Sequence, residues 1–116
     1  MNLFQTGNFT LHAGEASPFK IDCDALTQAD WQTLAALVAA RVQFGRVHGI
    51  PTGGCALAAA LEPYATTGPL LIVDDVLTTG TSMEAARAAA GEPCVGVVVF
   101  ARREPPDWIQ AVFRLW

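Results

Sequence analysis

The stretch LLIVDDVLTTGTS, residues 70–82, decides the fold. Four apolar residues lead into two adjacent carboxylates, Asp74 and Asp75, and then into small residues rich in hydroxyl groups. A continuous apolar run of this kind is typical of a central strand in a parallel sheet, and it predicts a strand over Pro69–Val73. The Ala-rich segment Ser82–Ala90 follows and predicts a helix.

The segments on either side repeat this alternation of strand and helix. We expect a helix over residues 28–43, a strand over Arg46–Ile50, a helix over Gly53–Leu61, a strand over Cys94–Ala101 and a C-terminal helix over Pro106–Trp116. Strands that alternate with helices imply right-handed crossovers and parallel pairing. The prediction is a single small three-layer α/β domain, with a short, mostly parallel sheet over residues 46–101, helices on both faces and an N-terminal arm over residues 1–25.

Composition limits what the chain can do. Of its 116 residues, 52% are hydrophobic and 16% are charged, which is the balance of a chain that buries a core. The net charge of -4, without a basic cluster, argues against nucleic-acid binding. No apolar run has the length of a membrane span, and the first ten residues lack the pattern of a signal peptide. Cys23, Cys55 and Cys94 form no metal or disulfide pattern, so we expect reduced thiols in a cytoplasmic protein.

Three loops of unusual sequence follow the three expected strands. They are PTGG (51–54), DDVLTTGTS (74–82) and ARRE (101–104). Ligands of open parallel sheets bind outside the carboxyl ends of the strands. We therefore expect these loops to lie along one edge of the sheet and to share a binding site.

The loop TTGTS has the features of an anion site. Backbone N–H groups at the start of a helix are unpaired and carry partial positive charge, and Gly80 permits close approach of a ligand. Asp74 and Asp75 would repel a bare phosphate, so they need another task, such as accepting hydrogen bonds from sugar hydroxyls or holding Mg²⁺ through water. The combination predicts a sugar phosphate with free hydroxyls. An ordinary helix N-cap and two solvated acids are the alternatives.

The same thirteen residues resemble the phosphoribosyl-pyrophosphate (PRPP) signature of type I phosphoribosyltransferases at every position. In that family the acid pair contacts the ribose hydroxyls and the loop holds the 5-phosphate. The resemblance implies that Asp74 and Asp75 are the catalytic acids and that they reach Mg²⁺ only indirectly, through ribose hydroxyls or water. The implied 5-phosphate ligands are Thr78, Thr79, Gly80, Thr81 and Ser82.

Two further segments extend the resemblance. GIPTGGCALAAAL (49–61) is similar to the family's pyrophosphate loop and its helix, which implies pyrophosphate binding by Pro51, Thr52, Gly53 and Gly54; a plain turn before a helix is the alternative. GNFTLHAGEASPFKIDC (7–23) resembles the N-terminal segment of orotate phosphoribosyltransferases, which helps to form the base pocket. The candidates for base or pyrophosphate contact there are Phe9, His12, Ser17, Phe19 and Lys20, and a packed arm is the alternative.

The chain departs from the family between the pyrophosphate helix and the signature strand. Full-length members place a further strand and a long mobile loop there, and the cations of that loop close over the pyrophosphate. Here only EPYATTG (62–68) intervenes, and no Lys or Arg occurs between Arg46 and Arg87. Preorganised cations normally stabilise a departing pyrophosphate, so catalysis is affected more than binding. Arg102 and Arg103 are candidates to replace them at the base or pyrophosphate site; an exposed pair is the alternative.

Two functions fit these residues. In the first, the chain is a phosphoribosyltransferase of nucleotide metabolism, which binds PRPP or a nucleoside 5'-monophosphate with Mg²⁺ and transfers phosphoribosyl to or from a nucleobase. In the second, it is a non-catalytic PRPP-binding or nucleotide-binding regulatory protein. A structural subunit without a ligand is a third reading. The apolar stripe of the C-terminal segment fits either core packing or the contact of a homodimer.

Overall fold

The computed structural model describes residues 2–11, 14 and 16–116. The strands of this part of the chain are β1 (Phe4–Thr10), β2 (Ala16–Ile21), β3 (Arg46–Gly49), β4 (Leu70–Leu77), β5 (Cys94–Ala101) and β6 (Ile109–Arg114). The α-helices are α1 (Gln28–Ala39), α2 (Cys55–Leu61) and α3 (Thr81–Ala90), with short 3-10 helices η1 (Cys23–Ala25) and η2 (Glu62–Tyr64).

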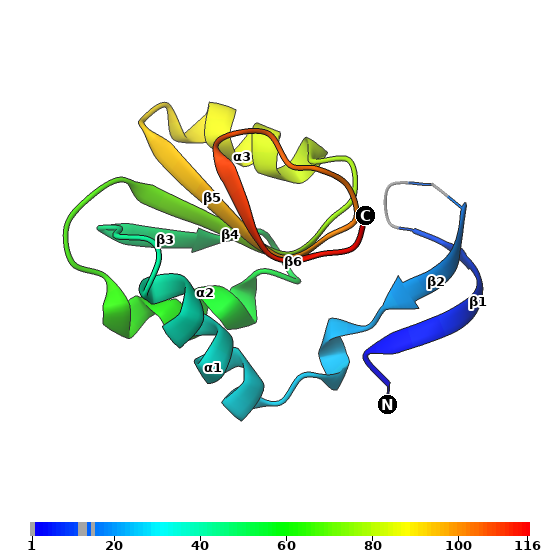
Figure 1. The fold of residues 1–116 in the computed structure, drawn as a ribbon. Helices are drawn as coiled ribbons and strands as arrows, with labels where there is room; N and C mark the ends of the chain where they lie inside the picture. The colour runs from blue at the N-terminus through cyan, green and yellow to red at the C-terminus, as the bar shows by residue number, and fades with distance from the viewer. Residues whose placement is uncertain (1, 12–13, 15) are drawn as a thin grey trace.

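The main sheet has the strand order β3-β4-β5-β6, and every neighbouring pair is parallel. Strands β1 and β2 form a separate antiparallel hairpin beside the carboxyl ends of the main strands (Figure 1). Helices α1 and α2 lie on one face of the main sheet and α3 on the other. The expected α/β fold, with a parallel sheet between two helical layers, is confirmed.

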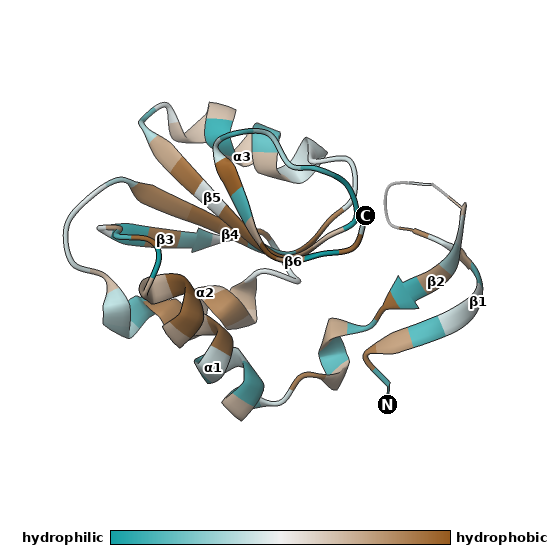
Figure 2. Ribbon diagram, viewed as in Figure 1, coloured by the Kyte–Doolittle hydropathy of each residue, from teal (hydrophilic) through white to brown (hydrophobic). Residues whose placement is uncertain are grey.

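Two hydrophobic cores hold these layers together. The first core lies between the sheet and the pair α1 and α2, and it includes Leu34, Val38, Leu57, Leu61, Leu71, Val73, Val97 and Val99. The second core lies under α3 and includes Met83, Leu70, Ile72, Leu77, Val98 and Ile109. Figure 2 shows the resulting pattern, in which β4, β5 and α2 are hydrophobic over most of their length. A strand buried on both faces needs such a continuous apolar run, which is why β4 and β5 were predictable.

Helix α1 begins at the residue that the sequence indicates. The Thr27 hydroxyl accepts a hydrogen bond from the Asp30 N–H at 3.2 Å, and the Asp30 carboxylate accepts one from the Thr27 N–H at 2.8 Å. This reciprocal capping box satisfies two N–H groups that the first turn leaves unpaired. No helix in the described ranges is long and apolar enough to span a membrane.

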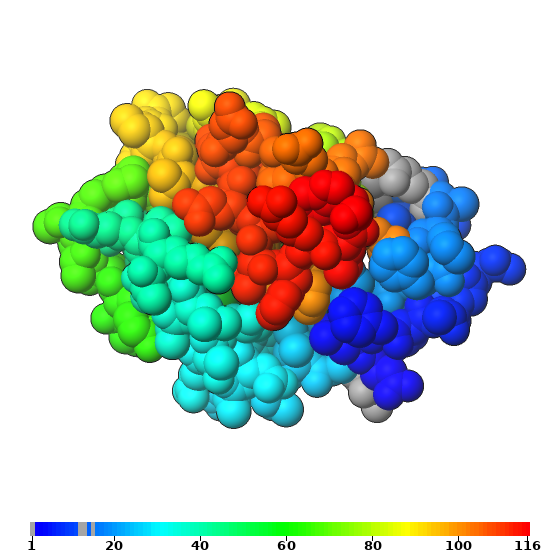
Figure 3. All heavy atoms as spheres, viewed as in Figure 1, coloured from blue at the N-terminus to red at the C-terminus, as the bar shows by residue number. Residues whose placement is uncertain are grey.

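The C-terminal segment corrects the prediction. Residues 106–116 were expected to form a helix, but Ile109–Arg114 is strand β6, and the main sheet therefore extends beyond residue 101 to Arg114. Ile109 and Ala111 pack on the α3 side while Val112 packs on the other side, so the apolar residues serve both faces of a strand. A two-sided strand and a broad helical stripe give the same short apolar pattern. The unpaired edge of β5 decides between them, since β6 satisfies its backbone groups. Figure 3 shows this segment, in red, between the N-terminal hairpin and the remainder of the domain.

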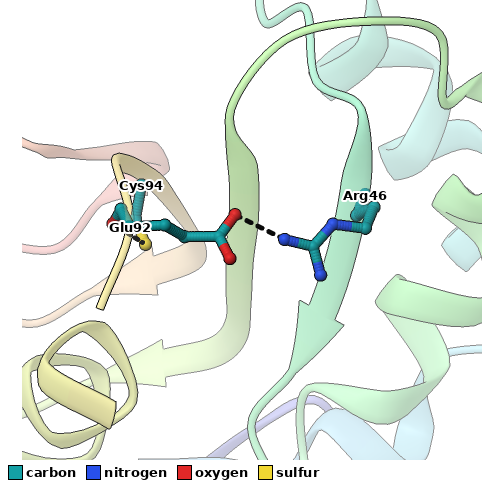
Figure 4. Close-up of polar contacts among 3 residues, drawn as sticks. All are labelled: Arg46, Glu92 and Cys94. Atoms are coloured by element: carbon teal, nitrogen blue, oxygen red, sulfur yellow. Dashed lines mark hydrogen bonds and ion pairs between the residues drawn. The ribbon is translucent and has the colours of Figure 1, made fainter. Parts of the chain in front are cut away.

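An ion pair lies at the amino ends of the parallel strands. Arg46, at the start of β3, meets Glu92, in the connection from α3 to β5, and the Cys94 thiol donates to the Glu92 carbonyl oxygen at 3.1 Å (Figure 4). A cavity of about 610 Å³ opens beside this pair, lined partly by small residues of α3. Since both side chains of the pair are exposed, it contributes little to stability. The three unusual loops lie at the other end of the strands.

Candidate functional site

A cavity of about 690 Å³ lies at the carboxyl ends of β3, β4 and β5. Its lining combines residues from all three unusual loops with residues from the N-terminal hairpin: Leu11, Lys20, Ile21, Ile50, Pro51, Thr52, Gly53, Asp74, Asp75, Val76, Leu77, Thr78, Thr79, Gly80, Thr81, Ser82, Met83 and Arg102. The structure thus brings together most of the site residues expected from the sequence. Gly54, Phe9 and Arg103 do not line this cavity, and His12 lies outside the described residues.

Strand β4 continues through the acid pair instead of ending at Val73. The Asp75 N–H donates to Asp74 Oδ1 at 2.8 Å, and the Val76 N–H donates to Asp75 Oδ1 at 2.7 Å. Leu77 packs in the second core, although strict alternation would place it with Val73 in the first. The alternation therefore shifts by one residue at the acids, although the pairing register with β5 is the same on both sides, and the local side-chain hydrogen bonds occupy backbone N–H groups there.

The two carboxyl groups share an environment that favours a bound proton. Partial burial raises the pKa of Asp74 to about 7, and the hydrogen bond that its protonated carboxyl donates to Asp75 acts in the same direction, as does the negative charge of Asp75. Asp74 therefore keeps its proton for much of the time near neutral pH. A cation or a set of hydroxyl donors at this position would favour release of that proton.

Asp75 is surrounded by two residues from distant parts of the chain. A Cβ atom added at Gly53 would lie 2.5 Å from Asp75 Oδ2, so the carboxylate rests directly against the PTGG loop. On another side is Cys23, whose pKa is raised to about 12 by burial and then by the charge of Asp75 and a hydrogen bond with it. The Cys23 thiol is therefore protonated and acts as the donor. The sequence predicts only a reduced thiol for Cys23, and its separation from Asp75 gives no signal of this contact.

The PTGG loop is held close to the end of β4. The Gly54 N–H donates to the Ile50 carbonyl at 2.8 Å, and a Cβ at Gly54 would overlap the Val73 carbonyl oxygen. Gly54 is buried, so its role is to let the loop pack on β4, while Pro51, Thr52 and Gly53 face the cavity. The Pro51–Thr52 peptide bond is cis.

The TTGTS loop turns directly into α3. Gly80, at the N-cap, has φ of +84°, a left-handed conformation that residues with a Cβ rarely adopt. The hydroxyls of Thr79 and Thr81 lie 3.0 Å apart and share a hydrogen bond. The loop thus places hydroxyl groups and the start of α3 on the cavity, which is an arrangement suited to an anion.

Arg102 joins the end of β5 to the N-terminal hairpin. Its guanidinium donates to the Ser17 hydroxyl and, at 3.3 Å, to the Phe19 carbonyl, and it lies 3.9 Å from the centroid of the Phe19 ring. Ser17 is buried, and its hydroxyl donates in turn to the Phe19 carbonyl at 2.6 Å. These contacts fix the hairpin over the cavity. Arg103, the other candidate, is exposed beside it.

Lys20 brings a second cation to the cavity. Its Nζ lies 5.2 Å from the centroid of the Phe9 ring, so Phe9 supports Lys20 and does not itself face the cavity. A cation–π contact of this kind contributes about 0.5–1 kcal/mol at an exposed position. Ser17 and Phe19 likewise act on the cavity through Arg102.

Known proteins with solved structures share this fold. No family model matches the chain, and no curated protein sequence matches it. Solved structures do: UMP synthase from Leishmania donovani has a TM-score of 0.74 and 23% identity over 97% of this chain and 34% of that one. Orotate phosphoribosyltransferase from Aeropyrum pernix has a TM-score of 0.70 and 25% identity, with 88% of this chain and 77% of that one covered. The orotate phosphoribosyltransferase from Mycobacterium tuberculosis H37Rv, solved with Fe(III) dicitrate, has a TM-score of 0.68 and 19% identity, with 97% of this chain and 89% of that one covered.

The chain has the fold of the orotate phosphoribosyltransferases. The resemblance seen in the sequence is thereby confirmed as a structural relation to type I phosphoribosyltransferases. The chain spans about a third of the length of the Leishmania UMP synthase. The similarity defines the architecture of the chain.

The resemblance to type I phosphoribosyltransferases also implies Mg²⁺. The two carboxylates in the cavity fit a metal ion that is held mainly by the substrate. Within the described residues, no group of three or more His, Cys, Asp or Glu side chains could hold an ion. Mg²⁺ commonly keeps several waters and binds through one or two carboxylates together with substrate phosphates. Asp74 and Asp75 supply two carboxylates on the cavity wall. These suit a metal ion that is held together with substrate and water, and not one that is held by protein ligands alone.

Proposed function

We propose that this chain binds PRPP or a nucleoside 5'-monophosphate with Mg²⁺ and transfers phosphoribosyl to or from a nucleobase. The observation that carries the proposal is that one cavity is lined by the acid pair, the TTGTS loop and the PTGG loop. A sugar flanked by a phosphate and a pyrophosphate needs these three kinds of partner side by side. The structural similarity to orotate phosphoribosyltransferases supports the same reading.

Each loop has a defined task in the proposal. Asp74 and Asp75 accept hydrogen bonds from the ribose hydroxyls and, through those hydroxyls or water, orient Mg²⁺. The residues that bind the 5-phosphate are Thr78, Thr79, Gly80, Thr81 and Ser82. The residues that bind the pyrophosphate are Pro51, Thr52 and Gly53, with Gly54 setting the loop conformation. When bound, Mg²⁺ neutralises negative charge on the pyrophosphate.

The hairpin and the end of β5 form the remaining wall. Lys20 and Arg102 are placed to contact the base or the pyrophosphate, and Phe9 supports Lys20. In the transfer, a bond forms between ribose C1 and a ring nitrogen of the base while the bond from C1 to the pyrophosphate oxygen breaks. The base nitrogen loses its proton to solvent, and pyrophosphate leaves.

The second candidate is a non-catalytic PRPP-binding or nucleotide-binding protein. It is favoured by the connection from α2 to β4, where η2 and a short loop replace the cationic lid and no Lys or Arg occurs between Arg46 and Arg87. We also propose a homodimer, because Phe4, Phe113 and Trp116 are about half exposed. Sedimentation equilibrium tests the dimer directly: a monomer mass at high protein concentration would exclude it.

Titration calorimetry with PRPP and Mg²⁺ tests the site. We expect micromolar binding by the wild type and loss of binding in Asp74→Asn/Asp75→Asn. The matched control is Asp24→Asn/Asp107→Asn, which removes two exposed carboxylates outside the cavity and should bind like the wild type. A folded wild type that binds neither PRPP nor nucleotide would refute the proposal. If binding is found, pyrophosphate release with a panel of nucleobases separates the enzyme from the non-catalytic protein.

A further inference from the structure

Lys20 is the only lysine in the sequence, and it lines the candidate site. It lies near the end of β2, opposite Gln5 of β1, in the hairpin wall of the cavity. The PTGG loop forms another wall of the same cavity. We propose that Lys20 binds the pyrophosphate group of PRPP and supplies the positive charge that the absent cationic loop would otherwise provide. This inference rests on the proposed function and assigns a further residue to it.

The charge balance of the cavity creates the need for such a residue. The PTGG loop offers backbone groups and one hydroxyl but no cation, and Asp75 lies directly against Gly53. A pyrophosphate group placed on that loop would therefore face a carboxylate at short range. Mg²⁺ offsets part of the repulsion, and a protein cation elsewhere in the cavity lining offsets more. Of the described residues that line the cavity, Lys20 and Arg102 are the cationic ones.

The contacts of the two cations differ. Arg102 is fixed to the hairpin by hydrogen bonds to Ser17 and Phe19 and by stacking on the Phe19 ring, so its guanidinium stabilises the position of the hairpin. The Lys20 ammonium rests over the Phe9 ring, 5.2 Å from its centroid, which is a weak contact. A lysine side chain has a flexible four-carbon stem and a compact charge with three donors. Lys20 can therefore leave Phe9 for a pyrophosphate oxygen at small cost, whereas Arg102 would have to release the hairpin.

A comparison of two ligands tests the assignment. Mg²⁺–PRPP and ribose 5-phosphate share the sugar and the 5-phosphate, and only PRPP carries pyrophosphate. We expect Lys20→Met to weaken Mg²⁺–PRPP binding about 10- to 100-fold, the effect of losing one charged hydrogen bond, and to leave ribose 5-phosphate within about twofold. Lys20→Arg keeps the charge and should restore most of the affinity. The control Arg114→Met removes a cation that lies over Trp116, outside the cavity, and should change neither affinity.

Each result has a distinct meaning. An equal loss for both ligands in Lys20→Met, or no loss for either, would overturn the role of Lys20 while leaving the proposed function intact. Failure of the folded wild type to bind either ligand would refute the proposed function itself, and the inference with it.

Chemical protection gives a second measurement that needs no variant. Because Lys20 is the only lysine, its acetylation by acetic anhydride can be followed by peptide mass spectrometry without interference from other side-chain amines. Saturating Mg²⁺–PRPP should slow the acetylation of Lys20 at least about fivefold, since a bound ammonium is a poor nucleophile, while ribose 5-phosphate should not. The same rate with and without bound PRPP would contradict the proposal.

Discussion

The carboxylate of Asp75 lies directly against Gly53, so the acid pair and the PTGG loop are in contact in the candidate site. A Cβ atom at position 53 would lie 2.5 Å from Asp75 Oδ2 and 2.6 Å from Oδ1. Such a separation is far below van der Waals contact, so position 53 accepts no side chain while Asp75 keeps its orientation. A side chain at position 53 would therefore displace the Asp75 carboxylate.

Gly53→Ala should displace Asp75 and weaken ligand binding. We expect a loss of about 1–3 kcal/mol in the free energy of unfolding, as for an overpacked site, and at least about a tenfold loss of Mg²⁺–PRPP affinity. Urea titration and calorimetry measure the two effects. A double-mutant cycle provides the control: in an Asp75→Ala background the stability cost of Gly53→Ala should largely disappear. An undiminished cost there would show that the alanine disturbs something other than the Asp75 carboxylate.

The raised pKa of Asp74 makes the stability of the ligand-free protein depend on pH. Its pKa is about 7 in the folded chain against 3.8 in the unfolded chain, so between these values the folded state binds more protons. The contribution of Asp74 to stability therefore falls as pH rises from about 4 to 7 and is lowest above 7. Asp74→Asn removes this penalty and should stabilise the protein at pH 8 by about 1–2 kcal/mol, after allowance for solvent screening, but hardly at pH 4.

Thermal unfolding at pH 4 and pH 8 measures this effect. A gain of 1–2 kcal/mol corresponds to a rise of several degrees in Tm for a chain of this size. Asp107→Asn, at an exposed position outside the cavity, is the matched control and should show no such pH dependence. Equal effects of Asp74→Asn at both pH values would argue against a proton shared by the acid pair.

The same proton should be released when ligand binds. Ribose hydroxyls donate to carboxylates, and Mg²⁺ favours the ionised form, so binding lowers the pKa of the pair. At pH 6 we expect release of about half a proton or more per Mg²⁺–PRPP, and at pH 8.5 almost none from this pair. Calorimetry in two buffers of different ionisation enthalpy gives the number of protons. Release that is the same at both pH values would exclude Asp74 as its source.

Much of the fold was predictable because local signals and tertiary packing agree. The continuous apolar runs of β4 and β5, rich in β-branched residues, favour buried parallel strands, and the Thr27–Asp30 capping box marks the start of α1. The signature stretch also placed the acid pair and the TTGTS loop on one cavity. In each of these cases the residues that predict the structure are close together in the sequence.

The remainder depends on contacts between distant residues. Strand β6 forms because β5 needs a hydrogen-bonding partner, and nothing within Ile109–Arg114 distinguishes that strand from a helical stripe. The contact of Cys23 with Asp75 and the bond of Arg102 to Ser17 join residues from opposite parts of the chain. The spacing of residues in the sequence does not predict such pairs, because only the folded topology brings them together.

The bond from Arg102 to Ser17 predicts how firmly the hairpin covers the cavity. Arg102→Met removes two hydrogen bonds and the stacking on Phe19, and it leaves the buried Ser17 hydroxyl without its charged donor. Amide hydrogen exchange in β1 and β2 should then accelerate about tenfold or more, while exchange in β4 and β5 stays unchanged. The control is Arg41→Met, at an exposed position after α1. Faster exchange throughout the main sheet would mean that Arg102 supports the whole fold and not the hairpin alone.

Ile109 tests the contribution of β6 to the core. It is 4% exposed and packs in the second core, and a Cβ at Gly96 of β5 would lie only 2.9 Å from its Cγ1, so the two strands are closely fitted. Ile109→Ala should therefore cost about 2–5 kcal/mol of unfolding free energy, the range for truncating a buried aliphatic residue. Gln110→Ala, at the next and exposed position, should cost less than about 0.5 kcal/mol. Urea unfolding compares the two variants, and similar small costs for both would mean that the C-terminal strand is peripheral to the core.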